Sequence, residues 1–279
     1  MIIEPRVRSV GSIAVQRLLP WRMRRTVGPF TFLDVMGPTD FAAGDGMDID
    51  AHPHIGLSTL TYLLAGRARH RDSLGTVQTI AAGEVNWMSA GSGVCHTERS
   101  LPEDRDAGSR LWGLQFWVAL PDGAEDGPPT FEHLGSSAVP VVEEGPSRLR
   151  LLVGTGWGVA SPVTGSSPLV LADVRLSGEA LPLIGDHAEW AVLALDGAPV
   201  VAGGALDPGR LHVFEAGEER VIGGSGRVIV IGGEPLGRRH IWWNFVHSDP
   251  GRIEEAKERW RRQEFPKVPD DHDPWVPLP

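Results

Sequence analysis

The amino-acid sequence predicts an all-β protein with two β-barrels in tandem and a short C-terminal helix. Strand-like runs recur at short spacing, and turn-forming residues separate them, with 35 glycines and 23 prolines in the 279-residue chain. The spacing of glycines in the first half also recurs in the second half. These observations favour barrels or sandwiches over alternating strands and helices.

The predicted strands are rich in the aromatic and β-branched residues that strands favour. The clearest are residues 111–120 (LWGLQFWVAL) and 227–231 (RVIVI). Examples of such runs are Leu57–Leu64, Val85–Met88, Leu111–Leu120, Arg148–Val153, Leu169–Leu176, Trp190–Leu195, Arg210–Phe214 and Arg227–Ile231. Gly, Pro or Asp residues lie between these runs, as is expected where one strand turns into the next.

One helix is predicted near the end of the chain. Asp249 can cap it, and Pro250 suits its first position. Ile253, Ala256 and Trp260 then recur at helical spacing on one face. Two prolines a few residues further on end the helix. The tail that follows is rich in proline, and we expect it to be extended.

The boundary between the halves is predicted within residues 121–147, which are rich in proline, glycine, serine and acidic residues, as an interdomain linker is. Gly83 and Gly91 in the first half are eight residues apart, and so are Gly209 and Gly217 in the second half. This repeat fits a duplicated barrel. The predicted division is an N-terminal domain at 1–130, the linker at 131–147, a C-terminal domain at 148–247, and the helix and tail at 248–279.

Composition and charge narrow the classes of function. The net charge of −10 argues against direct binding of nucleic acid, which requires clusters of Lys and Arg. No apolar run approaches the length of about 18 residues that a membrane span requires, and the N-terminal MIIEPRVRSV lacks the apolar core of a signal peptide. The single cysteine, Cys95, permits no internal disulfide and fits a reducing compartment. We therefore expect a cytoplasmic protein that contacts no membrane.

Two short motifs in the first half carry metal-binding residue types. Residues 52–54 read His-Pro-His, so the two imidazoles point to the same face of a strand. Residues 96–98 read His-Thr-Glu, which places an imidazole and a carboxylate together by the same rule. Two such strands side by side inside a barrel would offer three nitrogens and one oxygen to a single ion. That set suits Fe, Mn, Ni, Co, Cu or Zn and leaves positions open for water or substrate.

A structural role is the alternative for each histidine, because a lone histidine is more often a hydrogen-bonded polar residue than a ligand. Two paired motifs with glycine-rich turns between them favour ligation instead. His52, His54, His96 and Glu98 are therefore predicted to bind one divalent transition metal per chain.

Residues beside the motifs receive structural interpretations. Cys95 adjoins His96, but strand alternation points it away from the ion, and we expect a buried, inert thiol. His70 precedes a turn that Asp72 and Ser73 are predicted to form. The aromatic residues of the predicted strands are assigned to the core, although some could line a pocket above the metal.

These segments resemble known families. Gly46 with His52-Pro53-His54, followed by Gly83 to His96, resembles the two-part motif of the cupin superfamily, whose domains are jelly-roll β-barrels. HPHIGLSTLTYLLAGRARHRDSLG (52–75), AAGEVNWMSAGSGVCHTE (81–98) and GEPLG (233–237) resemble the pirin family of two-domain cupins more closely. The resemblance extends from GPFTFLDVMGP (28–38) to the C-terminal helix.

The chain departs from the general cupin motif at one ligand position. A glutamate usually follows the His-x-His pair by four residues, and Ser58 stands there instead. The resemblance to pirins implies that Glu98 completes the site. In the second half, the positions that match His96 and Glu98 are Ile222 and Gly224, so the metal is expected in the first domain only.

The resemblance to pirin-like quercetinases implies a dioxygenase that uses Fe(II) and acts on a flavonol of the quercetin type or a related enolic aromatic compound. Glu98 would take the proton of the 3-hydroxyl group as general base, and dioxygen would open the ring with release of carbon monoxide. The implied partners are a small aromatic substrate and dioxygen, and a monomer is expected.

Two alternatives remain beside the enzyme. Some pirin-like proteins are regulators, and here iron would set a conformation that a protein partner recognises, without turnover. The other alternative is a metal-stabilised scaffold without activity. We favour the enzyme, because all four ligands are present and the open metal positions suit a substrate.

Overall fold

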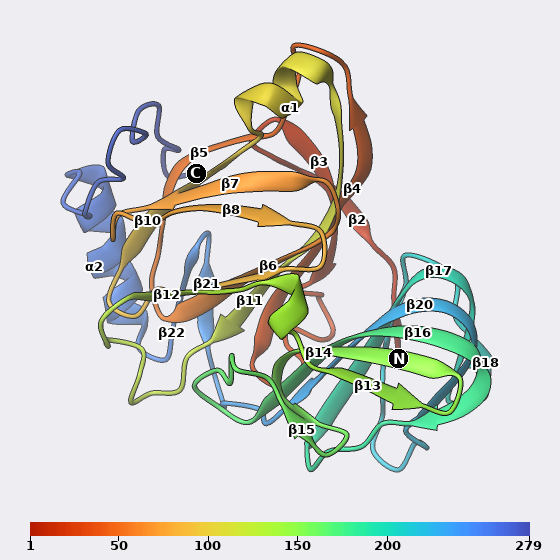
Figure 1. Cartoon of the computed structure of the whole chain (residues 1–279). Coiled ribbons are helices and arrows are strands. Elements are labelled where there is room, and N and C mark those ends of the chain that lie inside the picture. Colours follow the sequence, from red (N-terminus) through yellow and green to blue (C-terminus); the bar gives the residue numbers. More distant parts are fainter. The chain divides into compact units, whose positions relative to one another are not determined.

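The computed structural model describes residues 1–279 and consists mainly of β-strands, with two α-helices and one short 3-10 helix at Ser136–Ala138 (Figure 1). Each of the eight predicted runs forms a strand, which confirms the all-β prediction. The stretch predicted as a linker is more structured than expected, since it holds most of strand β12 (Thr130–Leu134) and strand β13 (Val141–Glu144). Both strands are short and lack a continuous apolar run, so their sequences resemble loops.

The chain divides into two compact units, and each contains segments that are distant in the sequence. The N-terminal unit comprises Val7–Val15, Leu33–Ser136 and Leu236–Pro279. The C-terminal unit comprises Met1–Arg6, Gln16–Phe32 and Ser137–Pro235. The contiguous domain limits predicted from the sequence stay a prediction.

Two sheets contain most strands of the N-terminal unit, although residues 16–19 of β3 (Ile13–Leu19) and residues 30–32 of β4 (Phe30–Phe41) are assigned to the C-terminal unit. The seven-stranded sheet contains, in spatial order, β12, β9 (Val85–Ser89), β6 (Leu57–Ala65), β11 (Ser109–Ala119), β4, β3 and β2 (Arg6–Val10). The four-stranded sheet contains β5 (Asp48–His54), β10 (Val94–Arg99), β7 (Arg67–Asp72) and β8 (Val77–Ala81). Hydrogen bonds do not close these sheets on themselves, so the predicted barrel is open.

One apolar cluster joins the two sheets of the N-terminal unit. It combines Leu63 and Leu111 of the seven-stranded sheet with Ile49, Ala68 and Ile80 of the four-stranded sheet, all of them buried. The sheets therefore face each other across this core. Burial on both faces explains why β6 and β11 have nearly continuous apolar sequences.

The C-terminal unit is a nine-stranded sheet. Its strands are β1 (Ile2–Ile3), β19 (Leu211–Val213), β17 (Glu189–Val201), β20 (Val221–Gly233), β16 (Leu169–Pro182), β14 (Ser147–Gly156) and β13 in spatial order, with β15 (Val159–Ala160) paired to β14 and β18 (Gly204–Ala205) paired to β17. Alternate residues of the long strands form its core: Ala172, Val230 and Val192 occupy one row across the sheet. The residues on either side of them are buried as well, which explains why these strands have continuous apolar runs.

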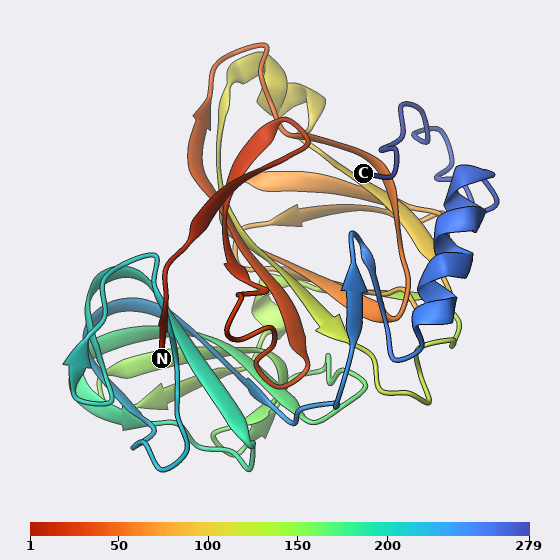
Figure 2. The same cartoon turned by 180° about the vertical axis from the view of Figure 1, so that it is seen from behind.

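Helix α2 (Pro250–Arg261) confirms the predicted C-terminal helix. Asp249 caps it by accepting a hydrogen bond from the Gly251 amide at 2.7 Å. Its buried residues are the predicted Ile253, Ala256 and Trp260. They pack in a cluster that includes residues of β5 and β10, and both views place the helix beside these strands (Figures 1 and 2).

Helix α1 (Pro102–Ala107) and the hairpin of β21 (His240–Trp242) and β22 (Phe245–His247) are among the elements that were not predicted. Helix α1 has six residues and buries none of them, so no apolar periodicity marks it. The hairpin of β21 and β22 belongs to the N-terminal unit although it lies near the end of the chain. Neither α1 nor α2 combines the length and the apolar character that a membrane crossing needs.

Candidate metal centre

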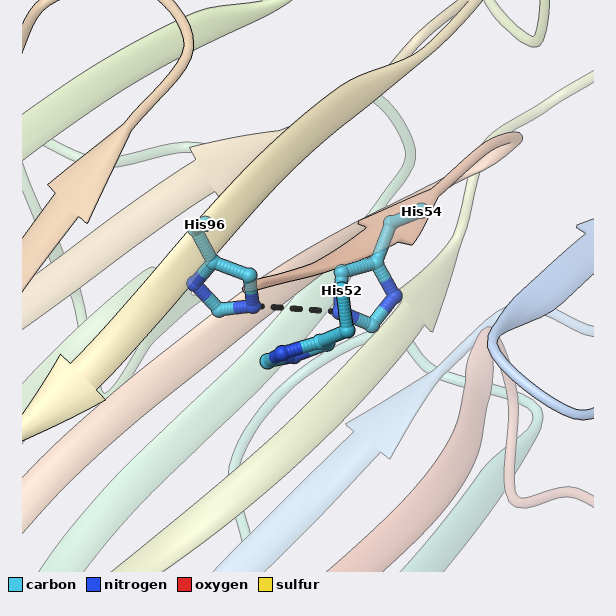
Figure 3. A group of neighbouring side chains, drawn as sticks. All are labelled: His52, His54 and His96. Carbon is cyan, nitrogen blue, oxygen red and sulfur yellow. Dashed lines mark hydrogen bonds between the residues drawn. The ribbon is translucent and has the colours of Figure 1, made fainter. Parts of the chain in front are cut away.

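Three histidines from two neighbouring strands point toward one another inside the N-terminal unit (Figure 3). His52 and His54 lie on β5 and His96 lies on β10, and the antiparallel register pairs His96 with His52. Their ligand nitrogens lie within 4.8 Å of one another, and all three side chains are buried. The fold thus brings together the three histidines that the sequence motifs single out.

The second ring nitrogen of two of these histidines is bonded to a backbone carbonyl. His52 Nδ1 lies 2.8 Å from the carbonyl oxygen of Asp50, and His54 Nδ1 lies 3.1 Å from that of Asn244. Because a carbonyl oxygen can only accept a hydrogen bond, each Nδ1 carries the hydrogen and each Nε2 keeps its lone pair. Both side chains therefore offer Nε2 as the ligand atom.

A β-bulge in β5 supplies the first of these carbonyls. His96 pairs with His52 and Glu98 pairs with Ile49, so β5 has one residue more than β10 over this stretch. An extra residue in one strand interrupts the ladder locally. The carbonyl of Asp50 lies in this irregular stretch and accepts the hydrogen of His52.

The hairpin of β21 and β22 supplies the second carbonyl, that of Asn244. The Val246 amide of the hairpin donates to the carbonyl of Ile55 at 3.2 Å, directly after β5. Gly56 has a φ of +64°, and a Cβ at this position would lie 1.9 Å from the Val246 carbonyl oxygen. A glycine is therefore needed for the hairpin to approach the end of β5 and reach His54.

The third histidine is held by other side chains. His96 Nδ1 lies 3.3 Å from His70 Nδ1, and His70 Nε2 lies 3.0 Å from Asp72 Oδ2. Burial acts to raise the pKa of Asp72, but hydrogen bonds from His70 and Thr76 outweigh it and lower the pKa below its usual value. The Asp72 carboxylate is therefore ionised.

The separation of two ligand nitrogens tests whether a cation fits. His54 Nε2 and His96 Nε2 lie 3.1 Å apart (Figure 3). Two lone pairs at this distance repel each other unless a proton or a cation lies between them. Burial lowers the pKa of both rings well below the usual value, and lowers that of His52 to about 4. Three neutral, buried imidazoles therefore fit a divalent transition metal better than a proton.

Glu98 lies on β10, two residues after His96, and is buried. The Thr61 hydroxyl lies 3.1 Å from Glu98 Oε1 and 3.0 Å from Gln115 Oε1. Burial raises the pKa of Glu98, and the smaller effects of His70 and Thr61 oppose the rise. The group of mutually close ligand atoms contains the imidazoles but not this carboxylate. The role of Glu98 as fourth ligand stays a prediction.

Sequence reasoning did not identify the groups that orient the ligands. A signal for His70 exists in the alternation along β7, where Ala68, His70 and Asp72 are buried. Asn244 lies 190 residues from His54 and acts through its backbone carbonyl, which every residue type has. No feature of the sequence near Asn244 marks this contact.

The residues around the centre are largely aromatic or apolar. The ring centroids of Trp117 and His54 are 5.2 Å apart, and Phe131 stacks on His70 at 4.7 Å. Cys95 lies in an apolar cluster with residues of α2, and burial raises the pKa of its thiol. The thiol is thus buried and protonated, which fits the buried, inert thiol expected from the sequence.

The fold and the three-histidine centre define a two-domain cupin. The family model for Pirin matches residues 12–118, and the model for the Pirin C-terminal cupin domain matches residues 171–266. The chain belongs to the pirin family.

Relatives and solved structures support this assignment along the whole chain. A Pirin-like protein of Caulobacter vibrioides is 42% identical and aligns with 100% of this chain and 99% of its own length. A Pseudomonas aeruginosa protein that bears the name of a candidate quercetin 2,3-dioxygenase is 39% identical, over 90% of this chain and 79% of its own length. The crystal structure of quercetin 2,3-dioxygenase from Acinetobacter baumannii is 35% identical, with a TM-score of 0.91 over 100% of this chain and 94% of that one.

Proposed function

We propose that this chain is a mononuclear metal-dependent dioxygenase that opens the ring of a flavonol such as quercetin, or of a related enolic aromatic compound. The observation that carries the proposal is the combination of three convergent imidazoles with a buried carboxyl of raised pKa on the same sheet. His52, His54 and His96 are the proposed ligands, and Glu98 is proposed as the fourth ligand and the general base.

The histidines hold the ion and leave the acid–base chemistry to Glu98. A bound divalent ion, which we propose to be Fe(II), supplies a Lewis acid for an enolic oxygen and electrons for the activation of dioxygen. The same donors suit Mn, Ni, Co, Cu or Zn. The ligand side chains are buried, which excludes bulk water from the reacting groups.

Glu98 is suited to take the proton of a flavonol 3-hydroxyl group. Its raised pKa makes it a stronger base than an exposed carboxylate. The Thr61 hydroxyl donates to Oε1, which orients the carboxylate and favours its ionised form. Loss of the proton gives an electron-rich enolate, and each ring opening then consumes one dioxygen and releases one carbon monoxide.

The names of the relatives support this class of substrate. The Pseudomonas aeruginosa protein at 39% identity and the Acinetobacter baumannii structure at 35% identity both carry the name quercetin 2,3-dioxygenase, the first as a candidate. Both similarities cover at least 90% of this chain. The proposed substrate follows from these names together with the histidines and Glu98.

Elemental analysis paired with an aerobic quercetin assay tests the proposal. We expect about one equivalent of metal in the native protein, and loss of both metal and quercetin bleaching in a His52→Ala/His96→Ala double variant. His187→Ala is the matched control, because this buried histidine belongs to the C-terminal unit. It should keep both metal and turnover.

The outcomes separate the alternatives. Metal binding without turnover would favour a non-catalytic, iron-dependent regulator that binds a protein partner, and absence of metal after reconstitution would contradict the centre itself. Glu98→Gln should retain metal through the histidines and lose turnover by about 100-fold or more. Ordinary turnover in a metal-loaded Glu98→Ala variant would exclude Glu98 as the base.

A further inference from the structure

We infer that His70 and Asp72 form a hydrogen-bonded relay that fixes the tautomer of His96 and so keeps its Nε2 available to the metal. His70 and Asp72 are positioning residues in this scheme, since they act on the ion through His96. The inference rests on the proposed three-histidine metal centre.

The relay is continuous and buried. His96 Nδ1 lies 3.3 Å from His70 Nδ1, and His70 Nε2 lies 3.0 Å from Asp72 Oδ2. His70 is 4% exposed and Asp72 is 0% exposed, so bulk water does not compete for these bonds. His70 lies on β7 beside β10, opposite Glu98, while Asp72 is opposite His96 in the register. The strand pairing therefore places each member of the relay.

The hydrogen-bonding roles open to the three side chains determine which of them donates and which accepts in each bond of the relay. An ionised carboxylate can only accept, so His70 donates to Asp72 from Nε2. An imidazole that keeps a single hydrogen and donates it to Asp72 has a lone pair on its other nitrogen, so His70 Nδ1 is the acceptor in the relay. It takes the hydrogen on Nδ1 of His96, which leaves the lone pair of His96 on Nε2. Metal-bound histidines commonly donate their other nitrogen to a fixed acceptor, and here that acceptor is a second imidazole oriented by a carboxylate.

The ends of the relay are held by the surrounding structure. Asp72 Oδ1 accepts hydrogen bonds from the amides of Leu74 at 2.9 Å and Thr76 at 3.0 Å. These bonds fix the carboxylate in the turn between β7 and β8 and leave Oδ2 directed at His70. Phe131 stacks on the His70 ring with an interplanar angle of 23°. Asp72 thus forms the turn, as the sequence predicts, and also orients His70.

The relay predicts that a carboxylate-to-amide change reverses the hydrogens. In Asp72→Asn, the two turn amides keep an oxygen at Oδ1, and the amide nitrogen takes the place of Oδ2. That nitrogen donates to His70 Nε2, which moves the His70 hydrogen to Nδ1. His70 then donates to His96 Nδ1, and the His96 hydrogen moves to Nε2, the ligand atom. The variant should lose metal affinity although its shape is almost unchanged.

Nuclear magnetic resonance of the Zn(II)-loaded protein tests the tautomers directly, because a bound cation removes the need for a hydrogen between Nε2 of His54 and Nε2 of His96. Long-range 1H–15N correlation of labelled histidines shows which ring nitrogen carries the hydrogen. We expect hydrogen on Nε2 of His70 and on Nδ1 of His96 in the native protein, and hydrogen on Nδ1 of His70 in Asp72→Asn. Hydrogen on Nδ1 of His70 in the native protein would overturn the relay, and this measurement needs no variant to fold.

Titration with Co(II) tests the consequence for the metal. Asp72→Asn should bind Co(II) about 10- to 100-fold more weakly than the native protein, with altered visible bands. Ser73→Ala is the matched control, because Ser73 Oγ accepts a hydrogen bond from the Cys95 amide in the same turn region but lies outside the relay. Its affinity should stay within about twofold of native.

The two experiments distinguish failure of the relay from failure of the metal centre. Native Co(II) affinity in Asp72→Asn, with the native tautomers retained, would overturn the relay and leave the proposed function intact. Absence of Co(II) binding in the native protein would overturn the proposed function, whereas hydrogen on Nδ1 of His70 in a native protein that binds metal would overturn the relay alone.

Discussion

At the scale of single residues, the centre depends on which nitrogen of each imidazole carries the hydrogen. His52 and His54 are fixed by backbone carbonyls, which cannot change their hydrogen-bonding role. His96 is fixed by His70, a group that could either donate or accept. The position of the hydrogen on His52 and His54 is therefore determined by the backbone fold, whereas its position on His96 depends on the side chain of Asp72.

The orientation of Glu98 gives a prediction at the same scale. Thr61 donates to Glu98 Oε1 and favours the ionised carboxylate, so Thr61→Val should raise the pKa of Glu98 further. A base must be ionised to act, so the acid limb of the turnover profile should move to higher pH and turnover on that limb should fall by about 10-fold, since a hydrogen bond to a charged group contributes ~1.5–3 kcal/mol. The pH profile of quercetin consumption measures this. Thr59→Val, a buried threonine on the same face of β6, is the control. An unshifted acid limb would contradict the prediction.

The proposed ligand residues could be selected from the sequence because one physical rule acts locally. Strand alternation puts residues two apart on one face, which suffices to pair His52 with His54 and His96 with Glu98. No local rule predicts which groups accept hydrogen bonds from the ligand rings. The carbonyl of Asp50 is available because of a bulge, and Asn244 reaches the site through a hairpin far along the chain.

At the scale of elements, β5 lies at the edge of the four-stranded sheet and pairs within that sheet only with β10. The C-terminal tail covers its open side, where the Val276 amide donates to the carbonyl of Ala51 at 2.9 Å. Asp271 of the same tail accepts from the Thr97 hydroxyl at 2.7 Å and from Arg99 Nε at 2.9 Å. The tail therefore supports both ligand strands from outside, and an edge that could pair with another chain is protected.

Removal of the Asp271 carboxylate tests this support. Asp271→Ala leaves the fully buried Thr97 hydroxyl without its acceptor and removes a charged bond from Arg99. We expect a loss of about 2 kcal/mol in the free energy of unfolding, which is typical of a lost charge-assisted hydrogen bond. Urea unfolding of the metal-free protein measures it. Glu264→Ala, an exposed acidic residue near the start of the tail, should change stability by less than ~0.5 kcal/mol. Equal effects of the two changes would argue against a supporting tail.

The strands were predictable to the extent that burial shaped their sequences. β6 and β11 are buried on both faces and therefore read as long apolar runs. Helix α2 buries one face, so its apolar residues recur at helical spacing. Helix α1 buries no residue, and β12 and β13 alternate between exposed and partly buried positions. These three elements lack the apolar pattern on which sequence reasoning depends.

At the scale of the whole molecule, each compact unit recruits a segment from the far end of the chain. β1 pairs with β19 in the C-terminal unit, and Leu236–Pro279 belongs to the N-terminal unit. A fragment that ends at residue 147 would lack the Asn244 carbonyl and with it the acceptor for His54 Nδ1. The internal repeat indicated two similar domains, but a repeat does not show that terminal segments are exchanged between them.

The pH dependence of stability follows from the buried histidines. The pKa of His52 is lowered from 6.5 to about 4 in the folded chain, so the unfolded chain binds the proton first as pH falls. The stability that the neutral ring contributes is present above pH 6.5 and is lost as pH falls toward 4. The loss in the free energy of unfolding amounts to about 3 kcal/mol, because each unit of pKa shift is equivalent to about 1.4 kcal/mol. Glu98, whose pKa is raised, has the opposite effect: above its usual pKa of 4.5 it lowers the free energy of unfolding as pH rises.

Urea unfolding in the presence of a chelator should therefore show that the free energy of unfolding of the metal-free protein decreases between pH 6.5 and 5, and that it decreases less in His52→Leu. Equal slopes in both proteins would show that His52 is not the group responsible.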